Sequence, residues 1–174
     1  SRIERFLKYL REFGYQPVVL TTRGNREDWK EKKSNSSTDN IRVYRGFSIR
    51  RTPFRILSRY FKLEDAKDYL ETLFFIPDLA ITWVPDAIIK GLRIVKNENI
   101  ELILTTSPPE STHIIGMMLS KFTGKKWIAD FRDLWTQKKV VAYRPPTILH
   151  HKIAVKLEKC FFSRADHVVA VTQE

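Results

Sequence analysis

Residues 101–135 constrain the fold most, because they predict a strand, a helix and a second strand in direct succession. The apolar run at 102–105 has the length of a buried strand. Apolar residues then recur at helical spacing, and Gly124 follows them as the left-handed residue that commonly ends a helix. A second apolar run begins at Trp127. This order is typical of a parallel βαβ unit. The helix positions expected to be buried are Ile114, Ile115, Met118, Leu119 and Phe122.

The turn between the first strand and the helix, Ser107-Pro108-Pro109-Glu110, has the spacing of a capping box. In such a box the serine hydroxyl accepts from a backbone N–H of the first turn, and the glutamate reaches back to the cap. Pro108 suits the first helical position because it has no N–H and its φ is already helical. We therefore expect Ser107 to cap the helix, and contact with a ligand is the alternative role for this residue.

A cluster of ionisable residues, Asp130, Arg132 and Asp133, follows the second apolar run. In open parallel sheets, ligands bind outside the carboxyl ends of the strands, so this cluster and Ser107 are expected at one functional edge. Such groups are costly to bury unless they are paired or bind a ligand. One interpretation is an internal Arg–Asp pair that pins the loop. The other gives Asp133 a substrate-hydroxyl or general-base role and Arg132 a phosphate-binding role.

Helices and strands alternate along the rest of the chain, which predicts the α/β class. We expect a Rossmann-like three-layer domain with a mostly parallel sheet. The expected helices cover residues 3–10, 53–75, 85–95 and 148–164, and the further strands cover 18–20, 41–47 and 168–171. The polar segments 21–40 and 137–146 are expected to be loops. The buried stripe of the last helix is predicted to contain Leu149, Ile153, Leu157, Cys160 and Phe161.

The opening helix leads directly into a strand of parallel type, although a βαβ crossover needs a strand before its helix. We therefore expect one domain over residues 1–174 that lacks its first strand and is a fragment of a longer protein.

Residues 41–62 carry seven lysines and arginines and no acid, and aromatic residues are interleaved with them. This composition favours binding to an anionic partner, and the candidates are a membrane, a nucleic acid and a phosphorylated lipid. Arg51, Arg55 and Arg59 are the candidate contacts with such a surface. The alternative is that the apolar residues of this stretch are simply core and that the arginines lie on a solvated face.

Several functional classes lack their signatures. There is no phosphate-binding loop, no dinucleotide fingerprint and no nucleophile elbow, so a P-loop NTPase, a nicotinamide dehydrogenase and a serine hydrolase are unsupported. The adjacent residues His150 and His151 point apart on a helix, and no spacing of His, Cys and Asp suggests a metal. Cys160 is the single cysteine and fits a reducing cytoplasm; we interpret it as a core thiol.

The segment TTSPPESTHIIGMMLSKFTGKKWIADFRDLW at 105–135 resembles the N-terminal half of family 4 glycosyltransferases, which have two Rossmann domains (the GT-B type). It is most similar to the branch that builds bacterial surface polysaccharides. The resemblance extends upstream through FIPD at 75–78 and downstream to ADHVV at 165–169. The DFRDLW block in its strand context is the most specific part.

The resemblance implies transfer of a sugar from a nucleotide-sugar to a carbohydrate or lipid-linked acceptor, without a metal or another cofactor. This chain would be the acceptor-side half. In that family a second domain holds the nucleotide-sugar, so the fragment is expected to be inactive alone. The expected location is the cytoplasm, with peripheral contact at the inner face of the membrane.

The resemblance also implies the roles of individual residues. Asp133 and Asp130 are the catalytic candidates, and the substrate-binding candidates are Arg132, Ser107, Ser111, Thr112 and His113. In much of the wider family a His-Asp pair occupies positions 132 and 133. Asp133 matches that pair and Arg132 does not, and an arginine is a poor base and a good anion clamp.

Two alternatives from other classes stay open. One is a stand-alone binding or regulatory domain of flavodoxin-like type, and the other is a nucleic-acid-binding protein that uses the basic stretch. A reading frame that continues into a second Rossmann domain would exclude the first. A steep salt dependence of DNA or RNA binding would favour the second.

Overall fold

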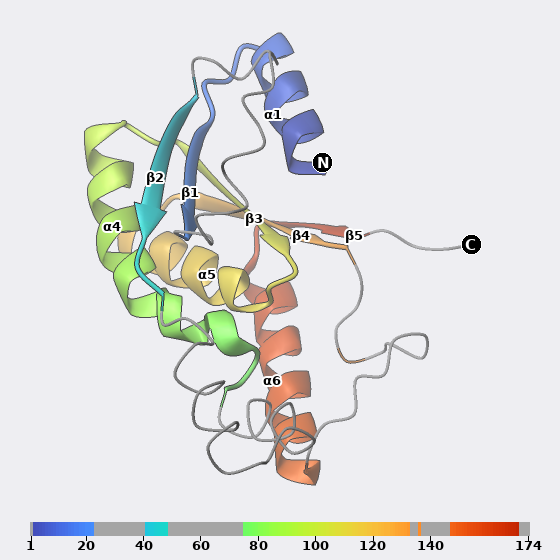
Figure 1. Cartoon of the computed structure of the whole chain (residues 1–174). Helices are drawn as coiled ribbons and strands as arrows, with labels where there is room; N and C mark the ends of the chain where they lie inside the picture. The colour runs from blue at the N-terminus through green and yellow to red at the C-terminus, as the bar shows by residue number, and fades with distance from the viewer. Residues whose placement is uncertain (1, 23–40, 49–74, 133–135, 137–146, 171–174) are drawn as a thin grey trace, which may run out of the picture. The chain divides into compact units, whose positions relative to one another are not determined.

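The computed structural model describes residues 2–22, 41–48, 75–132, 136 and 147–170 (Figure 1). The chain divides into two compact units, residues 1–48 and residues 49–174, and each is described here by itself. The predicted helical segments at 53–75 and the predicted loop at 137–146 lie outside the described residues, except for Phe75, which is not helical. The predicted loop at 21–40 also lies outside them, except for Thr21 and Thr22, where the prediction is wrong because both belong to strand β1. That both units belong to one domain stays a prediction.

The described residues of the first unit form one helix and two parallel strands. Helix α1 covers Arg2–Glu12, strand β1 covers Val18–Thr22 and strand β2 covers Arg42–Gly46 (Figure 1). Gly14 follows the helix with a φ of 83°, a left-handed conformation that glycine adopts without steric cost. The two strands pair in parallel from Val18↔Arg42 to Thr22↔Gly46. The predicted helix and both predicted strands are therefore present.

The second unit alternates helices and strands, as the sequence predicts. It begins with the short 3-10 helix η1, Leu79–Trp83, and the helix α4, Val84–Asn97. Strand β3 (Leu102–Ser107), helix α5 (Ser111–Thr123) and strand β4 (Lys126–Phe131) form the expected βαβ unit. Helix α6 (Ile148–Arg164) and strand β5 (His167–Ala170) follow. The strands pair in parallel in the order β3-β4-β5 (Figure 1), so the predicted α/β class is confirmed.

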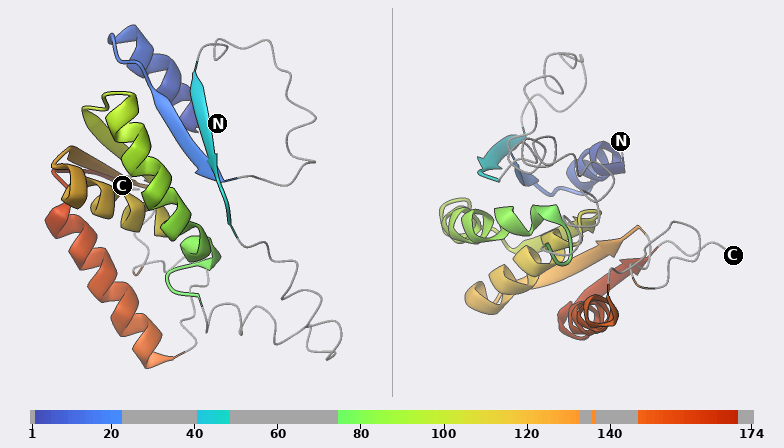
Figure 2. Two further views of the ribbon diagram at one scale, coloured as in Figure 1. Left: turned by 90° about the vertical axis from the view of Figure 1, so that its left-hand side faces the viewer. Right: turned by 60° about the horizontal axis from the view of Figure 1, so that its bottom comes forward.

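The core of this unit is formed by buried side chains of β3, β4, η1 and the helices α4, α5 and α6, and α5 packs against both other helices (Figure 2). Alternate residues of a strand face opposite sides of the sheet. Trp127, Ala129 and Phe131 are therefore on one side of β4, and all three are essentially inaccessible to solvent. The ring of Phe161 from α6 lies 6.3 Å from that of Trp127, so α5 and α6 cover the same face of the sheet.

Gly116 allows α5 to approach the sheet closely. A Cβ at this position would lie 2.4 Å from Nε1 of Trp127 and 2.6 Å from the methyl carbon of Thr105. Atoms cannot be this close, and the fully buried indole has no space into which to move. The absence of a side chain at position 116 therefore sets the distance between helix and sheet.

The predicted capping box at the start of α5 is wrong. Ser107 is the last residue of β3, and the helix begins at Ser111 after the residue Glu110, whose side chain makes no capping hydrogen bond. Asp78 from a distant segment caps the helix instead. Its carboxylate accepts from the backbone N–H of Ser111 at 2.9 Å and from the Ser111 hydroxyl at 2.8 Å. Pro108 precedes the helix and is not its first residue.

Two predicted buried positions are also wrong. Phe122 is 57% exposed on the outer side of α5. Leu149 is 64% exposed, because the inward face of α6 is formed by His150, Ala154, Glu158 and Phe161. Of the predicted stripe, only Phe161 is buried. Strand β5 is exposed along its length because it is the edge of the sheet, and no described strand pairs with its outer side.

Within the described ranges, none of the helices has both the length and the apolar character that crossing a bilayer requires.

The close approach at Gly116 generates a prediction about stability. The substitution Gly116→Ala should lower the free energy of unfolding by about 1–3 kcal/mol, because the indole and the β3 backbone would have to shift. Gly91→Ala on α4 is the matched control. Its Cβ would meet the flexible side chain of Leu119, with its two methyl carbons at 2.7 and 2.9 Å, and not a ring, so a smaller loss is expected. Urea unfolding of both variants measures the difference, and equal losses would contradict the account of Gly116.

Candidate functional site

The carboxyl ends of β3 and β4 place a buried carboxylate at one edge of the sheet. Thr106 and Asp130 are partners in the parallel register. The Thr106 hydroxyl donates to Oδ2 of Asp130 at 2.8 Å, and the Asp130 side chain is completely buried. A buried carboxylate is tolerated only where hydrogen bonds replace water. Asp130 is therefore held in one orientation at the edge where parallel sheets bind ligands.

Arg132 lies just beyond the end of β4 and is exposed. Among the described residues it forms no ion pair, so the predicted internal pair with Asp130 is not formed there. Its other predicted partner, Asp133, lies outside the described residues. An exposed guanidinium offers planar donors to an anion such as a phosphate. Arg132 is thus placed to bind an anionic group at this edge.

The turn between β3 and α5 uses its own polar side chains for structure. The hydroxyl of Thr112 lies 3.0 Å from the carbonyl oxygen of Thr106 and 2.8 Å from that of Pro109. The hydroxyl of Ser111 is bound to Asp78, and both Ser107 and Ser111 are buried. These contacts fix the shape of the turn beside Asp130. The predicted substrate-binding roles of these three residues stay predictions.

Asp78 holds two elements at this end of the unit. Besides its two bonds to Ser111, its Oδ1 accepts from the backbone N–H of Ala80 at 2.8 Å and so caps η1. A carboxylate at a helix N-terminus is also favoured by the helix dipole. Asp78 is not among the residues predicted for the site. The signal for its capping role was the Pro-Asp pair at 77–78, directly before an apolar segment.

His113 is buried behind the turn, on the opposite face of the sheet from Asp130. Its ring stacks on Phe131 with centroids 4.1 Å apart. The Oγ1 of Thr105 accepts from Nε1 of Trp127 at 2.7 Å and lies 2.9 Å from Nδ1 of His113. The Thr105 hydroxyl can donate to Nδ1 or accept from it, depending on the tautomer of His113. The Nε2 of His113 is buried and has no hydrogen-bond partner among the described residues.

Burial lowers the pKa of His113 from its usual value of 6.5 to about 4. The physical cause is the loss of water around the charged form. His113 is therefore neutral at pH 7 and can neither balance an anionic substrate nor act as a cationic acid. Its position among three aromatic rings makes it a part of the core, and its predicted contact with substrate stays a prediction.

Glu158 on α6 is another buried carboxylate, and it is not among the residues predicted for the site. It lies on the inward face of α6, where it accepts hydrogen bonds from the backbone N–H and the hydroxyl of Thr136. Thr136 is the residue directly after the DFRDLW block at 130–135. Glu158 therefore fixes the far end of the segment that begins at Asp130. The helical spacing of the apolar residues gives no signal for its burial, because the predicted stripe of α6 lies on another side of the helix.

The predicted site residues thus separate into two groups. Ser107, Asp130 and Arg132 all lie at the carboxyl ends of β3 and β4, but the register places the Ser107 and Asp130 side chains on opposite faces of the sheet, and His113 lies in the core on the Ser107 face. Asp133 and the arginines 51, 55 and 59 lie outside the described residues. Within the described part of the chain, no group of His, Cys, Asp and Glu side chains could hold a metal ion.

No protein-family model, no curated protein and no solved structure matches the chain.

The lowered pKa of His113 predicts a pH dependence of stability. Between pH 4 and 6.5 the unfolded chain binds a proton at this residue that the folded chain does not bind. The free energy of unfolding should therefore fall by about 3 kcal/mol as the pH drops through this range. Urea unfolding at a series of pH values measures this slope. His113→Gln should reduce the slope of the free energy of unfolding against pH by up to the contribution of one bound proton.

The exposed residue His151 gives the matched control, since His151→Gln should leave the slope unchanged. An NMR titration of the ring protons provides a reading that needs no variant. A His113 signal that titrates near pH 6.5 would contradict the assignment.

Proposed function

We propose that this chain is the acceptor-side half of a family 4-type glycosyltransferase, which moves a sugar from a nucleotide-sugar to a carbohydrate or lipid-linked acceptor. One observation carries the proposal. The Thr106–Asp130 hydrogen bond holds a carboxylate at the carboxyl edge of β3 and β4, and the guanidinium of Arg132 is exposed immediately beyond it. The similarity of residues 105–135 to that family agrees with this arrangement.

This arrangement suits a ligand that carries both hydroxyls and a phosphate. Carboxylates accept hydrogen bonds from sugar hydroxyls, and arginine binds phosphate oxygens with two parallel N–H groups. Lipid-linked acceptors and nucleotide-sugars both contain a diphosphate next to a sugar. A single ligand of this kind could therefore engage Arg132 through its phosphate and a neighbouring carboxylate through its sugar.

Asp133 is the proposed general base. As the acceptor oxygen forms its bond to the anomeric carbon of the donor, its proton passes to the carboxylate and the nucleoside diphosphate leaves. Asp130 is fully buried and already accepts from Thr106, which favours a role in positioning the segment that carries Arg132 and Asp133. Glu158 holds the other end of that segment through Thr136.

The rest of the proposed enzyme follows from the family. A second Rossmann domain would hold the nucleotide-sugar, and the reaction needs no metal or other cofactor. The acceptor would be presented at the inner face of the cell membrane, where the basic residues Arg51, Arg55 and Arg59 are proposed to contact anionic lipid.

The proposal predicts the kinetics of variants in the natural protein that contains this chain. Asp133→Ala should lower turnover by about 10² or more, which is the usual loss when a general base is removed. Arg132→Gln should raise the KM for the phosphate-bearing substrate, and Arg93→Gln on the exposed side of α4 is its matched control. Incubation with labelled nucleotide-sugars and lipid-linked acceptors measures both. Loss of thermal stability with unchanged turnover would contradict the catalytic role.

Residues 1–174 alone should transfer no sugar, because the donor site would belong to the second domain. The same assay with the isolated chain tests this expectation. Turnover of any nucleotide-sugar by these residues alone would refute the two-domain proposal.

A further inference from the structure

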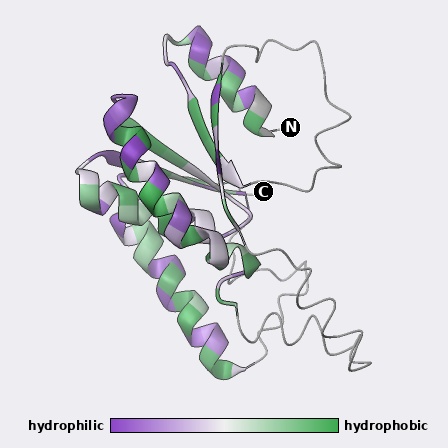
Figure 3. Ribbon diagram, turned by 60° about the vertical axis from the view of Figure 1, so that its left-hand side comes forward, coloured by the Kyte–Doolittle hydropathy of each residue, from purple (hydrophilic) through white to green (hydrophobic). Residues whose placement is uncertain are grey.

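The outward face of α6 is cationic. The helix carries Lys152, Lys156, Lys159 and Arg164, and its single acid is Glu158. Glu158 is buried and bound to Thr136, so it does not neutralise the surface. Figure 3 shows hydrophilic and hydrophobic residues alternating along this helix. The exposed side of α6 therefore contains positive charge without an acid from the helix itself.

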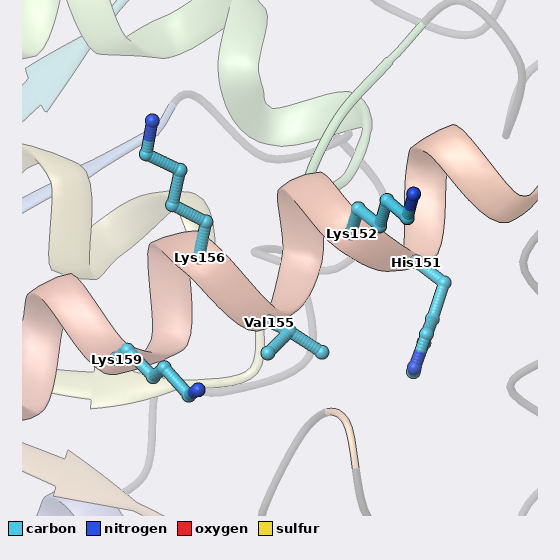
Figure 4. A pocket seen from close by; sticks show the side chains of 5 residues that line it. All are labelled: His151, Lys152, Val155, Lys156 and Lys159. Carbon is cyan, nitrogen blue, oxygen red and sulfur yellow. The ribbon is translucent and has the colours of Figure 1, made fainter.

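The three lysines form one row. At 100° per residue, they fall within about 60° of the helix circumference. This row is opposite the buried residues Ala154 and Phe161, so it points away from the core. Together with His151 and Val155, the lysines line an open hollow on the helix surface (Figure 4). We call the row Lys152, Lys156 and Lys159 the lysine face.

Two aliphatic residues border the lysine face at the start of the helix. Ile148 is 77% exposed and Leu149 is 64% exposed. On the helical wheel they lie on either side of the lysine row. Exposed aliphatic side chains next to lysines are the composition of a helix that lies on an anionic membrane, with the charges at the headgroups and the aliphatic residues in the acyl boundary.

Among the described residues, no acid forms an ion pair with the lysine face. Helix α5, which packs beside α6, contains no acid and carries Lys121 in its last turn. Asp166 follows α6, but its carboxylate accepts from the backbone N–H of Trp127 at 2.8 Å. The field of the lysines is thus available to a partner.

We propose that the lysine face of α6, together with Ile148 and Leu149, docks on an anionic phospholipid bilayer. Lysines alone would serve a nucleic acid equally well. The exposed aliphatic pair distinguishes the two partners, because a phosphate backbone offers these side chains no apolar environment, whereas the acyl boundary of a bilayer does. The inference concerns a different surface from residues 41–62, goes beyond the proposed transferase function and does not require it.

Co-sedimentation of the 174-residue chain with vesicles tests the proposal. The chain should bind vesicles of phosphatidylcholine mixed with phosphatidylglycerol, and not vesicles of phosphatidylcholine alone. Combined substitution Lys152→Gln, Lys156→Gln and Lys159→Gln should lower the partition coefficient on the order of 100-fold, since each lysine near an anionic surface contributes about a factor of five to ten. Added salt should weaken binding by the wild-type chain.

The matched control is the combination Arg93→Gln, Lys96→Gln and Lys121→Gln, which removes the same charge from exposed positions outside α6. It should change the partition coefficient less than threefold. Equal losses in the two triple variants would overturn the proposal, because they would show an effect of net charge and not of the lysine face. Circular dichroism confirms that both variants are folded.

A second variant tests the aliphatic pair. Ile148→Ser with Leu149→Ser should weaken binding to the mixed vesicles several-fold and leave the salt dependence unchanged. Binding of the wild-type chain to neutral vesicles as strongly as to anionic ones would overturn the proposal. The absence of vesicle binding would also overturn it. If the chain then bound duplex DNA or RNA in a salt-dependent way, and the lysine triple variant lost this binding, the lysine face would be assigned to nucleic acid.

Discussion

The packing of Trp127 against Gly116 is the interaction on which the second unit depends. The indole fills the space that a side chain on the helix would occupy, and it is completely buried. Its N–H donates to Thr105, whose hydroxyl lies next to Nδ1 of His113. One hydroxyl therefore satisfies two buried polar side chains and connects β3, β4 and α5. Disturbing any of these groups leaves a polar atom buried without a partner, which is costly.

The candidate site is held by contacts on both sides of this core. Asp78 caps α5 and fixes the turn that follows β3, whereas Glu158 holds Thr136 beyond the end of β4. Between these anchors, Asp130 is oriented by Thr106. Buried carboxylates are stable only when they are fully hydrogen-bonded. The buried carboxylates of Asp130 and Glu158 and the half-buried carboxylate of Asp78 thus position the backbone around the carboxyl edge, and the exposed Arg132 lies beside them.

The parts of the fold with strong periodicity could be predicted from the sequence, and the parts that depend on distant contacts could not. The run at 102–105, the stop at Gly124 and the run at Trp127 have local causes, and the βαβ unit follows from them.

The cap of α5 depends on a distant contact. A capping box is a local pattern, so the sequence favours Ser107 as the cap. Asp78 supplies it from 33 residues away. The inward face of α6 was misassigned for a related reason, since Glu158 is buried by its bond to Thr136 and the hydrophobicity of its neighbours does not reveal this. Ser107 and Asp130 were correctly expected at one edge, whereas the burial of His113 depends on aromatic rings from two other elements.

The most direct test of the account is whether ligand binds at the carboxyl edge of β3 and β4. The measurement is an NMR titration of the isotope-labelled chain with nucleotide-sugars and with short-chain lipid-diphosphate sugars, following the backbone amide signals. The account predicts shifts at Thr106, Ser107, Asp130 and Arg132, with none at Leu102 and Lys126 at the opposite ends of the same strands. Shifts confined to Leu102 and Lys126, or no shift with any of these ligands, would contradict it.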